Sequence, residues 1–598
     1  MRVPMRQIAL GLTVAALLPA VASAVELATS RAAMDRLTAD RAAGTIDEET
    51  YLLEAFRFNF APEKSSARYV PQQRELLKCF TPQMMDYSRA KAGLSQAAVD
   101  EIEGYLNPAS TARRATYISP GGNFEFTYFT TGANAVSATD VSPANGIPDF
   151  VERCAEYMDE SWDNQITTLG FTAPALGTNN LYEVSFAPQG SYGFTSAGTG
   201  GQSSITLHNT FLGFPANTDP DGNQLGAAKV TCAHEFKHGS QFTNNGWSEG
   251  GWVELDATWV EDITYDATND YYNYINFNSS NSQLSDPWLA LDNGGTGLYE
   301  DCLWQHFLSE KYGNQIIVDL WDRRAAFPTE NMKQSYQQTM MLYGTEWDVA
   351  WPEMYEWAWF TGSRAEPPFG FGEATSYLRM NLRQGAISSY PSNISDAVDQ
   401  IAAHPFRFNP GTTGMNPQIA FNGEDAHLNF TVSVIVEDAS SFTITQPALD
   451  ANQDFTYVVP QTWDQITYVG VIVTNSKRST GTKTYTLDVT ETMGAVDVSV
   501  SPGPQVDRLQ LHAAAPNPFR AATDIRFSMP RDERATVRIL DVAGRTVRVL
   551  QDGVFVAGEN TVRWDGRNNA GVKVPAGVYW SRVETAEGSV ARKIVAVR

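Results

Sequence analysis

Two histidines flank a glutamate at the spacing that a metal-binding helix requires. The stretch "TCAHEFKHGSQF", residues 231–242, places His234 and His238 four residues apart, with Glu235 beside the first. Residues i and i+4 lie on one face of a helix about one turn apart, so both imidazoles can reach a single metal ion. Glu235 could then act as a base on a metal-activated water. Because two histidines on an ordinary helix surface would read the same, the motif needs support from elsewhere in the chain.

A catalytic zinc site also needs a third protein ligand and an open position for water. Just downstream, "GGWVELDATWVEDITYD" has apolar and acidic residues at helical spacing. Glu254 and Glu261 are seven residues apart in it, so both can lie on one face of a second helix. If this helix packs antiparallel to the first, it brings a carboxylate to the two histidines.

The segments that must hold these residues are expected to be helical. The first is Ala-rich over 226–243 and is followed by an "NNG" stop signal at 244–246. Further helices are expected at 252–265, at 299–312 and around 346–360, and a few strands precede them. This mixture predicts an α+β domain from about residue 111 to 400.

At this point the chain resembles the gluzincin metallopeptidases. Their aminopeptidase branch has a glutamate ligand, then alanine, a small hydroxyl residue, an aromatic residue and a second glutamate, an order that this chain matches with Glu254, Ala257, Thr258, Trp259 and Glu261. The resemblance implies that Glu254 is the third zinc ligand and that Glu261 supports the site. The interval from His238 to Glu254 is shorter than in those enzymes, and their G-x-M-E-N motif is absent. Aminopeptidase specificity is therefore not carried over.

A broader resemblance is to a group of secreted bacterial metalloproteases. Three ordered motifs carry it over about residues 110–330: "NGIPDFVE" at 145–152, "AHEFKHGSQ" at 233–241 and "ELDATWVED" at 254–262. The resemblance implies a Zn²⁺ ion held by His234, His238 and Glu254. It also implies that Glu235 is the general base when a zinc-bound water attacks a peptide bond.

Such a reaction also needs a group that stabilises the tetrahedral oxyanion, usually Tyr or His. Tyr299, at the start of the expected helix 299–312, is the candidate, because its "YE" is loosely similar to the tyrosine motif of gluzincin aminopeptidases. His306, Tyr265 and Tyr271 are competitors.

The loop at residues 140–152 is a candidate for a second metal site. Asn145, Asp149 and Glu152 have a spacing similar to that of a Ca²⁺-binding loop, but Val141 and Pro143 stand where early acidic ligands are needed. We expect weak Ca²⁺ binding or none. The stretch "NTDPDGNQ", residues 217–224, is interpreted as a turn that leads into the metal helix.

The first residues and the overall charge bear on location. Arg2 and Arg6 precede an apolar run over 8–22 and small residues at Ala22 and Ala24, which predicts a signal peptide at 1–24. No stretch approaches the roughly 20 apolar residues of a membrane span. The formal net charge of −25 argues against nucleic acid as a partner. We expect an exported protein without a transmembrane segment.

Four widely spaced cysteines suit an oxidising compartment. Cys79, Cys154, Cys232 and Cys302 permit two disulfides in any of three pairings. Cys79 lies in a mostly helical segment, 25–110, interpreted either as a propeptide or as an attached subdomain. Its thiolate could occupy the open zinc position of a zymogen, but no known switch motif surrounds it, and a disulfide is the favoured interpretation.

Two β modules are expected after the α+β domain. Short strand runs separated by turn signals predict a β-sandwich at 405–495. A second module, 506–598, contains "APNPFRAATDIRFSMP" and "VRILDVAGRTVRVL" and resembles FlgD-like Ig-type domains and the related type IX secretion sorting domains. That resemblance implies export, and contact with a secretion machinery or the cell surface.

The expected fold class is multidomain, with an α+β zincin-like metallopeptidase core followed by two all-β, Ig-like sandwich modules. The expected function is a secreted zinc metallopeptidase that acts on protein or peptide substrates. The alternative is a surface-displayed binding or adhesion protein with an inactive protease-like core. Neither the substrate nor the choice between endo- and exopeptidase action is set by the motifs.

Overall fold

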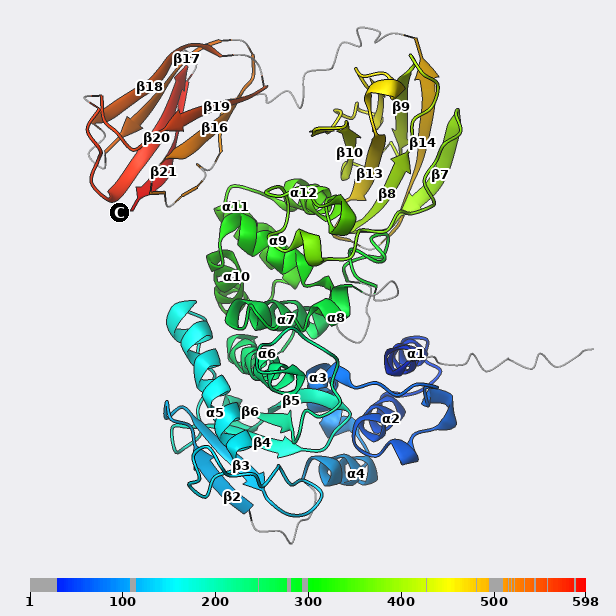
Figure 1. Ribbon diagram of the computed structural model, residues 1–598, viewed down its shortest axis with the longest axis vertical. Coiled ribbons are helices and arrows are strands. Elements are labelled where there is room, and N and C mark those ends of the chain that lie inside the picture. The colour runs from blue at the N-terminus through cyan, green and yellow to red at the C-terminus, as the bar shows by residue number, and fades with distance from the viewer. Residues whose placement is uncertain are drawn as a thin grey trace, which may run out of the picture.

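The protein is multidomain, with a helical N-terminal region, an α+β region and two β modules (Figure 1). This computed structural model describes residues 29–107, 114–245, 247–276, 281–292, 299–425, 427–479, 481–493 and, apart from short gaps, 509–597. The signal peptide expected at 1–24 lies outside the described residues. Within these ranges, no helix combines the length and apolar character that crossing a bilayer requires.

The N-terminal segment is mostly helical and has its own hydrophobic core. Its helices are α1 (Ser30–Ala42), α2 (Glu48–Phe60), α3 (Thr81–Ala90) and α4 (Gln96–Leu106), and its one strand is β1 (Leu77–Cys79). Side chains of Thr29, Asp47 and Ser95 cap three of the helices by accepting backbone N–H groups. Leu52, Phe56, Phe80 and Ile102 are fully buried in a cluster to which the rest of the protein contributes Phe194.

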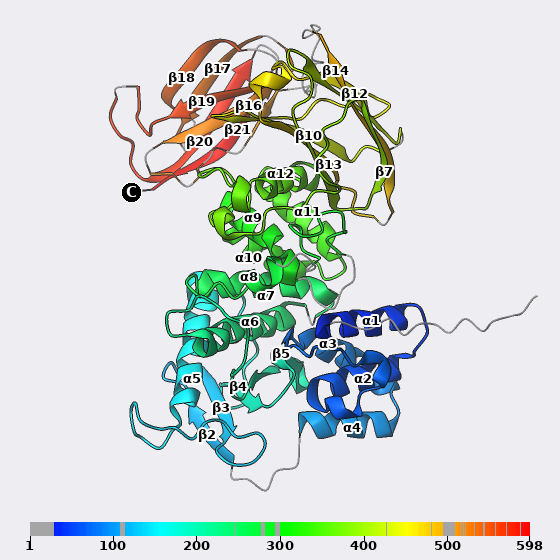
Figure 2. The same cartoon turned by 45° about the vertical axis from the view of Figure 1, so that its right-hand side comes forward.

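The α+β region is built on a six-stranded mixed sheet in the order β1-β5-β6-β4-β3-β2. Its strands are β2 (Arg114–Ile118), β3 (Phe124–Phe129), β4 (Tyr182–Ala187), β5 (Ser191–Ala197) and β6 (Ser203–His208). The outermost strand, β1, comes from the N-terminal segment and pairs in parallel with β5. Figures 1 and 2 both show the N-terminal helices alongside β5 and α6. The helical segment is therefore joined to the sheet by a strand that the sequence analysis did not anticipate.

Helices cover the sheet and then stack away from it. The first are α5 (Asp149–Trp162), α6 (Asn223–Asn245) and α7 (Val253–Thr264), followed by α8 (Tyr272–Ile275), α9 (Leu303–Tyr312), α10 (Gln315–Ala326), α11 (Met332–Leu342) and α12 (Trp347–Trp359). The helices predicted at 226–243, at 252–265, at 299–312 and near 346–360 are thus present. Helix α6 contacts β5, β6, α5, α7 and α10, which explains why nearly every residue from 227 to 241 is buried.

The third part is a β-sandwich of two four-stranded sheets, β11-β10-β13-β8 and β12-β9-β14-β7. Its strands are β7 (Ser392–Val398), β8 (Ala402–Phe408), β9 (Asn416–Gly423), β10 (Phe430–Glu437), β11 (Phe442–Thr445), β12 (Asp454–Val458), β13 (Tyr468–Asn475) and β14 (Lys483–Thr492). It starts earlier than the expected residue 405. The sheet containing β13 packs on α12, so Ile401, Tyr468 and Ile472 share one core with the helices.

The C-terminal module forms two further antiparallel sheets, β15-β16-β19 and β18-β17-β20-β21. Its strands are β15 (Gln510–Leu511), β16 (Thr523–Met529), β17 (Glu533–Leu540), β18 (Thr546–Phe555), β19 (Gly558–Trp564), β20 (Gly577–Thr585) and β21 (Gly588–Ala596). Fully buried side chains of Ile525, Val537 and Trp564 fill the space between the sheets. This module is therefore an all-β unit with its own core.

The contact between α12 and the sandwich leads to a stability prediction. A Cβ atom on Gly470 would lie 2.5 Å from the ring of Trp359, which is fully buried. Gly470→Ala should therefore destabilise the protein by about 1–3 kcal/mol in denaturant unfolding, because overpacking forces both elements apart. The cost should shrink in a Trp359→Phe background, which removes the ring atoms nearest to that position. Gly553→Ala in β18, where no heavy atom lies within 4 Å, is the matched control. Equal destabilisation by the two alanine variants would contradict the close approach.

Candidate functional site

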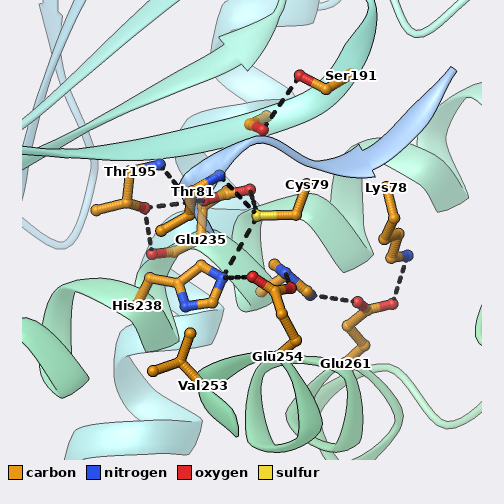
Figure 3. A network of polar contacts seen from close by, with 12 residues as sticks. Lys78, Cys79, Thr81, Ser191, Thr195, Glu235, His238, Val253, Glu254 and Glu261 are labelled. Atoms are coloured by element: carbon orange, nitrogen blue, oxygen red, sulfur yellow. Dashed lines mark hydrogen bonds and ion pairs between the residues drawn. The ribbon is translucent and has the colours of Figure 1, made fainter. Parts of the chain in front are cut away.

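Helices α6 and α7 bring the predicted histidines and Glu254 together in the interior. His234 Nε2 lies 3.0 Å from one carboxylate oxygen of Glu254, and His238 Nε2 lies 3.4 Å from the other. Figure 3 shows His238 and Glu254 pointing toward each other from the two helices. All three residues are at most 1% exposed. The structure thus converges two imidazole nitrogens and one carboxylate on a single buried point.

The other ring nitrogen of each histidine is fixed by a hydrogen-bond partner. His234 Nδ1 lies 2.7 Å from Glu261 Oε1, and His238 Nδ1 lies 2.8 Å from Gln241 Oε1. Gln241 also donates to the Val253 carbonyl at the start of α7, which ties the two helices together. An acceptor at Nδ1 holds a proton there and fixes the ring so that Nε2 is the nitrogen that faces the Glu254 carboxylate.

This donor set fits a divalent metal ion. Two neutral imidazoles and a carboxylate are the ligands that zinc commonly takes in catalytic sites. Glu254 Oε1 is buried without a hydrogen-bond donor, and ligand atoms of Cys79, His234, His238 and Glu254 all lie within 4.8 Å of one another. A buried, unpartnered carboxylate oxygen beside two imidazole nitrogens is costly unless a cation compensates it.

The close approach of the histidines and carboxylates shifts their pKa values. Burial alone would lower the pKa of His234, but hydrogen bonds and charges from Glu254 and Glu261 raise that pKa to about 10. Burial would raise the pKa of Glu254, yet the charge of His238 and the close approach of both rings lower it to about 2. Without a metal, a proton on His234 therefore compensates the Glu254 carboxylate.

Glu235 is held by residues from β5 and the N-terminal segment. Its Oε2 accepts hydrogen bonds from Thr195 Oγ1 at 2.9 Å and from Thr81 Oγ1 at 3.0 Å, while Cys79 Sγ donates to Oε1 at 3.3 Å (Figure 3). Strand β5 can approach because residue 193 is glycine. A Cβ atom there would lie 3.0 Å from Glu235 Cγ. One oxygen of Glu235 is thus anchored by threonines and the other faces the cluster.

A buried lysine extends this network. Lys78 Nζ lies 2.8 Å from Glu261 Oε2 and 2.6 Å from Asp270 Oδ2, and its side chain is 1% exposed. Burial would lower the pKa of Lys78, but the charges of Asp270 and Glu261 raise it. The N-terminal segment therefore contacts Glu261, which orients the His234 ring, and it also contacts Glu235.

Tyr299 lies beside the cluster, in the 3-10 turn Tyr299–Asp301. It is 7% exposed, and burial together with the charge of Glu254 raises its pKa well above the usual value. The competitors point elsewhere: Tyr265 donates to the Tyr157 carbonyl, Tyr271 bonds Glu373 and Tyr377, and His306 stacks on Tyr271. Of the four candidates for the oxyanion-stabilising group, Tyr299 is the one placed near Glu254.

The structure tests the disulfide expectation and shows how the loop at 140–152 is held. The disulfide interpretation is wrong for the structure, since Cys79, Cys154, Cys232 and Cys302 are all buried and free. In the loop at 140–152, Asp140 and Asp149 accept hydrogen bonds from the loop's own backbone N–H groups, and Asn145 donates to Glu152. The loop thus holds its shape by internal hydrogen bonds.

Several residues of the site were not anticipated. Gln241 was within reach of sequence reasoning, because it lies three residues after His238 on the same helix face and inside a quoted motif. Lys78, Thr81 and Thr195 come from segments more than 35 residues away from the histidines in sequence, and no local pattern connects them.

Comparisons with known proteins address the C-terminal module. Residues 519–589 match the FlgD Ig-like domain family. None of the curated proteins matches the chain. One similar solved structure is PorZ of Porphyromonas gingivalis, described as an essential bacterial surface component of the type-IX secretion system, with 21% identity, a TM-score of 0.12, and coverage of 19% of this chain and 14% of PorZ. Another is dimeric latent PorU from the same organism, with 14% identity, a TM-score of 0.15, and coverage of 34% and 20%. The chain thus spans a small part of either structure, and at these TM-scores neither likeness supports an argument.

The partners of Nδ1 lead to a prediction about metal affinity. Gln241→Ala frees the His238 ring to rotate, so zinc affinity should fall roughly 10–100-fold in a competition titration with a chromogenic chelator. Gln224→Ala, an amide at the opposite end of α6, should leave affinity unchanged. Equal affinities for the Gln241→Ala variant and the unmodified protein would contradict the role of Gln241.

A second prediction concerns protons. Because the pKa of His234 is about 10 in the metal-free protein, zinc must displace a proton from this ring at lower pH. Affinity should therefore rise as pH increases toward 10. In a Cys79→Ala variant, calorimetry at about pH 8 in buffers of different ionisation enthalpy should show at least one proton released per zinc, with one from His234 and a further fraction from zinc-bound water, whose pKa is about 7. Glu261→Gln should reduce that release by lowering the pKa of His234. Release that Glu261→Gln leaves unchanged would refute this assignment.

Proposed function

We propose that this chain is a zinc-dependent peptidase of gluzincin type. The observation that supports it most is the convergence of His234 Nε2, His238 Nε2 and the Glu254 carboxylate, with each Nδ1 already engaged by an acceptor. Glu235 lies on the same helix and directs one oxygen toward the same point. This combination offers three metal ligands and a base within one buried cluster.

His234, His238 and Glu254 would hold the zinc ion. When bound, zinc supplies Lewis acidity, which lowers the pKa of water to about 7 and polarises the carbonyl of the scissile bond. Glu261 keeps the His234 ring in place, and Gln241 does the same for His238.

Glu235 is the general base of the proposed reaction. Thr195 holds Oε2, which leaves Oε1 as the oxygen that takes a proton from the attacking water. The same oxygen can return that proton to the leaving amine. Tyr299 is the proposed donor to the oxyanion, in line with its burial beside Glu254.

The C-terminal module would serve export or surface attachment rather than chemistry. Its match to the FlgD Ig-like domain family and its separate hydrophobic core support this assignment. The proposed location is the cell surface or the medium, with a protein or peptide as substrate.

The role of Glu235 can be tested without disturbing the metal. Glu235→Gln should retain one zinc per chain by elemental analysis but lose roughly 100- to 10,000-fold in casein hydrolysis, because the amide cannot accept the proton. The assay uses the full chain before and after cleavage at a specific protease site introduced at 108–113. Glu125→Gln, a carboxylate on β3, is the control. Undiminished hydrolysis by Glu235→Gln, or a wild-type chain that is metal-free and inert in both forms, would overturn the proposal in favour of a binding protein.

A further inference from the structure

The proposed active site is closed to substrate in this structure. His234, Glu235, His238 and Glu254 are 0–1% exposed. A peptidase that acts on proteins must admit an extended chain to its metal ligands and base. The part of the chain that covers these groups therefore has to leave before catalysis. The N-terminal segment is such a part, because Cys79 and Thr81 contact His238 and Glu235.

Cys79 of that segment stands where a fourth ligand would stand. Its Sγ lies 3.5 Å from His238 Nε2 and 3.3 Å from Glu235 Oε1, and it is 2% exposed. With His234, His238 and Glu254 it forms a cluster of four donors, all within 4.8 Å of one another. Four protein ligands make a closed tetrahedral zinc site, whereas a catalytic site keeps one position for water.

Strand β1 also takes a position that suits an extended peptide. It pairs in parallel with β5, with Leu77 opposite Ser191 and Cys79 opposite Gly193. The Leu77 and Phe80 N–H groups donate to the Gly190 and Gly193 carbonyls at 2.8 and 3.1 Å. On its other side β5 pairs with β6, so β1 fills the remaining edge. Strand addition at a sheet edge is a common way to bind an extended peptide.

The segment is fastened by polar contacts but has a core of its own. Lys78 pairs with Glu261 and Asp270, Arg31 with Glu300, and Arg89 donates to the Trp247 carbonyl at 2.8 Å. The hydrophobic cluster of α1–α4 is separate from that of the α+β region, apart from Phe194 of β5, which joins it, and Met85 and Leu76, which pack against the other core. A unit with its own core can dissociate once the chain that links it is cut.

We infer that residues 29–107 are an inhibitory segment, in which Cys79 is the fourth zinc ligand and β1 occupies the edge of β5 that an extended peptide substrate needs. This inference rests on the proposed peptidase function. Cys79 would hold zinc as a thiolate: its S–H bond would break, the proton would pass to Glu235 Oε1, its hydrogen-bond partner, and a sulfur lone pair would become the donor to the metal. Glu235 would then be blocked as a general base, because Oε1 carries the thiol's proton and Oε2 accepts a hydrogen bond from Thr81.

The sulfur ligand can be tested spectroscopically on the full chain loaded with Co²⁺. The wild-type protein should show a sulfur-to-cobalt charge-transfer band in the near ultraviolet, and Cys79→Ser should lose it while still binding one Co²⁺. Cys302→Ser, which removes another buried cysteine, should keep the band. An unchanged band in Cys79→Ser, or one Co²⁺ per wild-type chain without the band, would overturn the inference and leave the peptidase proposal standing. A wild-type chain that binds no metal would overturn both.

Inhibition is tested by cutting the chain at the protease site introduced at 108–113. After cleavage and release of the segment, the charge-transfer band should disappear and casein hydrolysis by the zinc-loaded protein should rise about tenfold or more, because an intramolecular blocker acts at millimolar effective concentration. Adding the released segment back should restore inhibition, and the Cys79→Ser segment should do so less well. An uncut protein that is as active as the cut one would overturn the inhibitory role.

Discussion

The structure depends on the way that buried charge is compensated between α6, α7 and β1. Glu235, Glu254, Glu261 and Asp270 are all at most 1% exposed, and Lys78 is the buried lysine that pairs with two of them. Carboxylates are not stable in a protein interior without cations or donors. In the metal-free protein a proton on His234 supplies part of that compensation. A divalent cation between the histidines and Glu254 would supply it more fully, which is the physical basis of the proposed function.

The same compensation links the N-terminal segment to the site. Lys78 and Cys79 are adjacent on β1, so one residue pairs with Glu261 while the next faces His238 and Glu235. Neighbouring side chains along a strand point to opposite faces of the sheet. Lys78 and Cys79 therefore point in different directions, and each reaches a different part of the same polar network. Loss of the segment would remove a cation and a thiol at once, while the histidines keep their Nδ1 partners on α6 and α7.

Local patterns in the sequence were sufficient to predict the helices that carry the proposed ligands. The i, i+4 spacing of His234 and His238 and the Ala-rich run predicted α6, and the acidic positions of "VELDATWVED" placed Glu254 on a second helix, where the structure has it. The C-terminal β module was also recognisable from its sequence motifs, and residues 519–589 match the FlgD Ig-like domain family.

Contacts between distant segments could not be predicted in this way. Strand β1 is three residues long and carries Lys78 and Cys79 with no periodic signal, and its pairing with β5 is fixed by the fold as a whole. An even number of cysteines favoured disulfides, yet Cys79 is set against His238, and Cys302 is buried at the start of α9. Helices α10 and α11 were missed because their apolar residues are interrupted by charged and polar ones.

We propose that α6, α7 and β1 enclose one zinc ion. Diffraction data from crystals of the full chain, collected just above and just below the zinc absorption edge, test it most directly. The account predicts one strong anomalous peak within bonding distance of His234 Nε2, His238 Nε2, Glu254 and Cys79 Sγ, about 2.0–2.3 Å from each. A folded, zinc-saturated protein with no peak at that position, or with its peak elsewhere, would contradict the account.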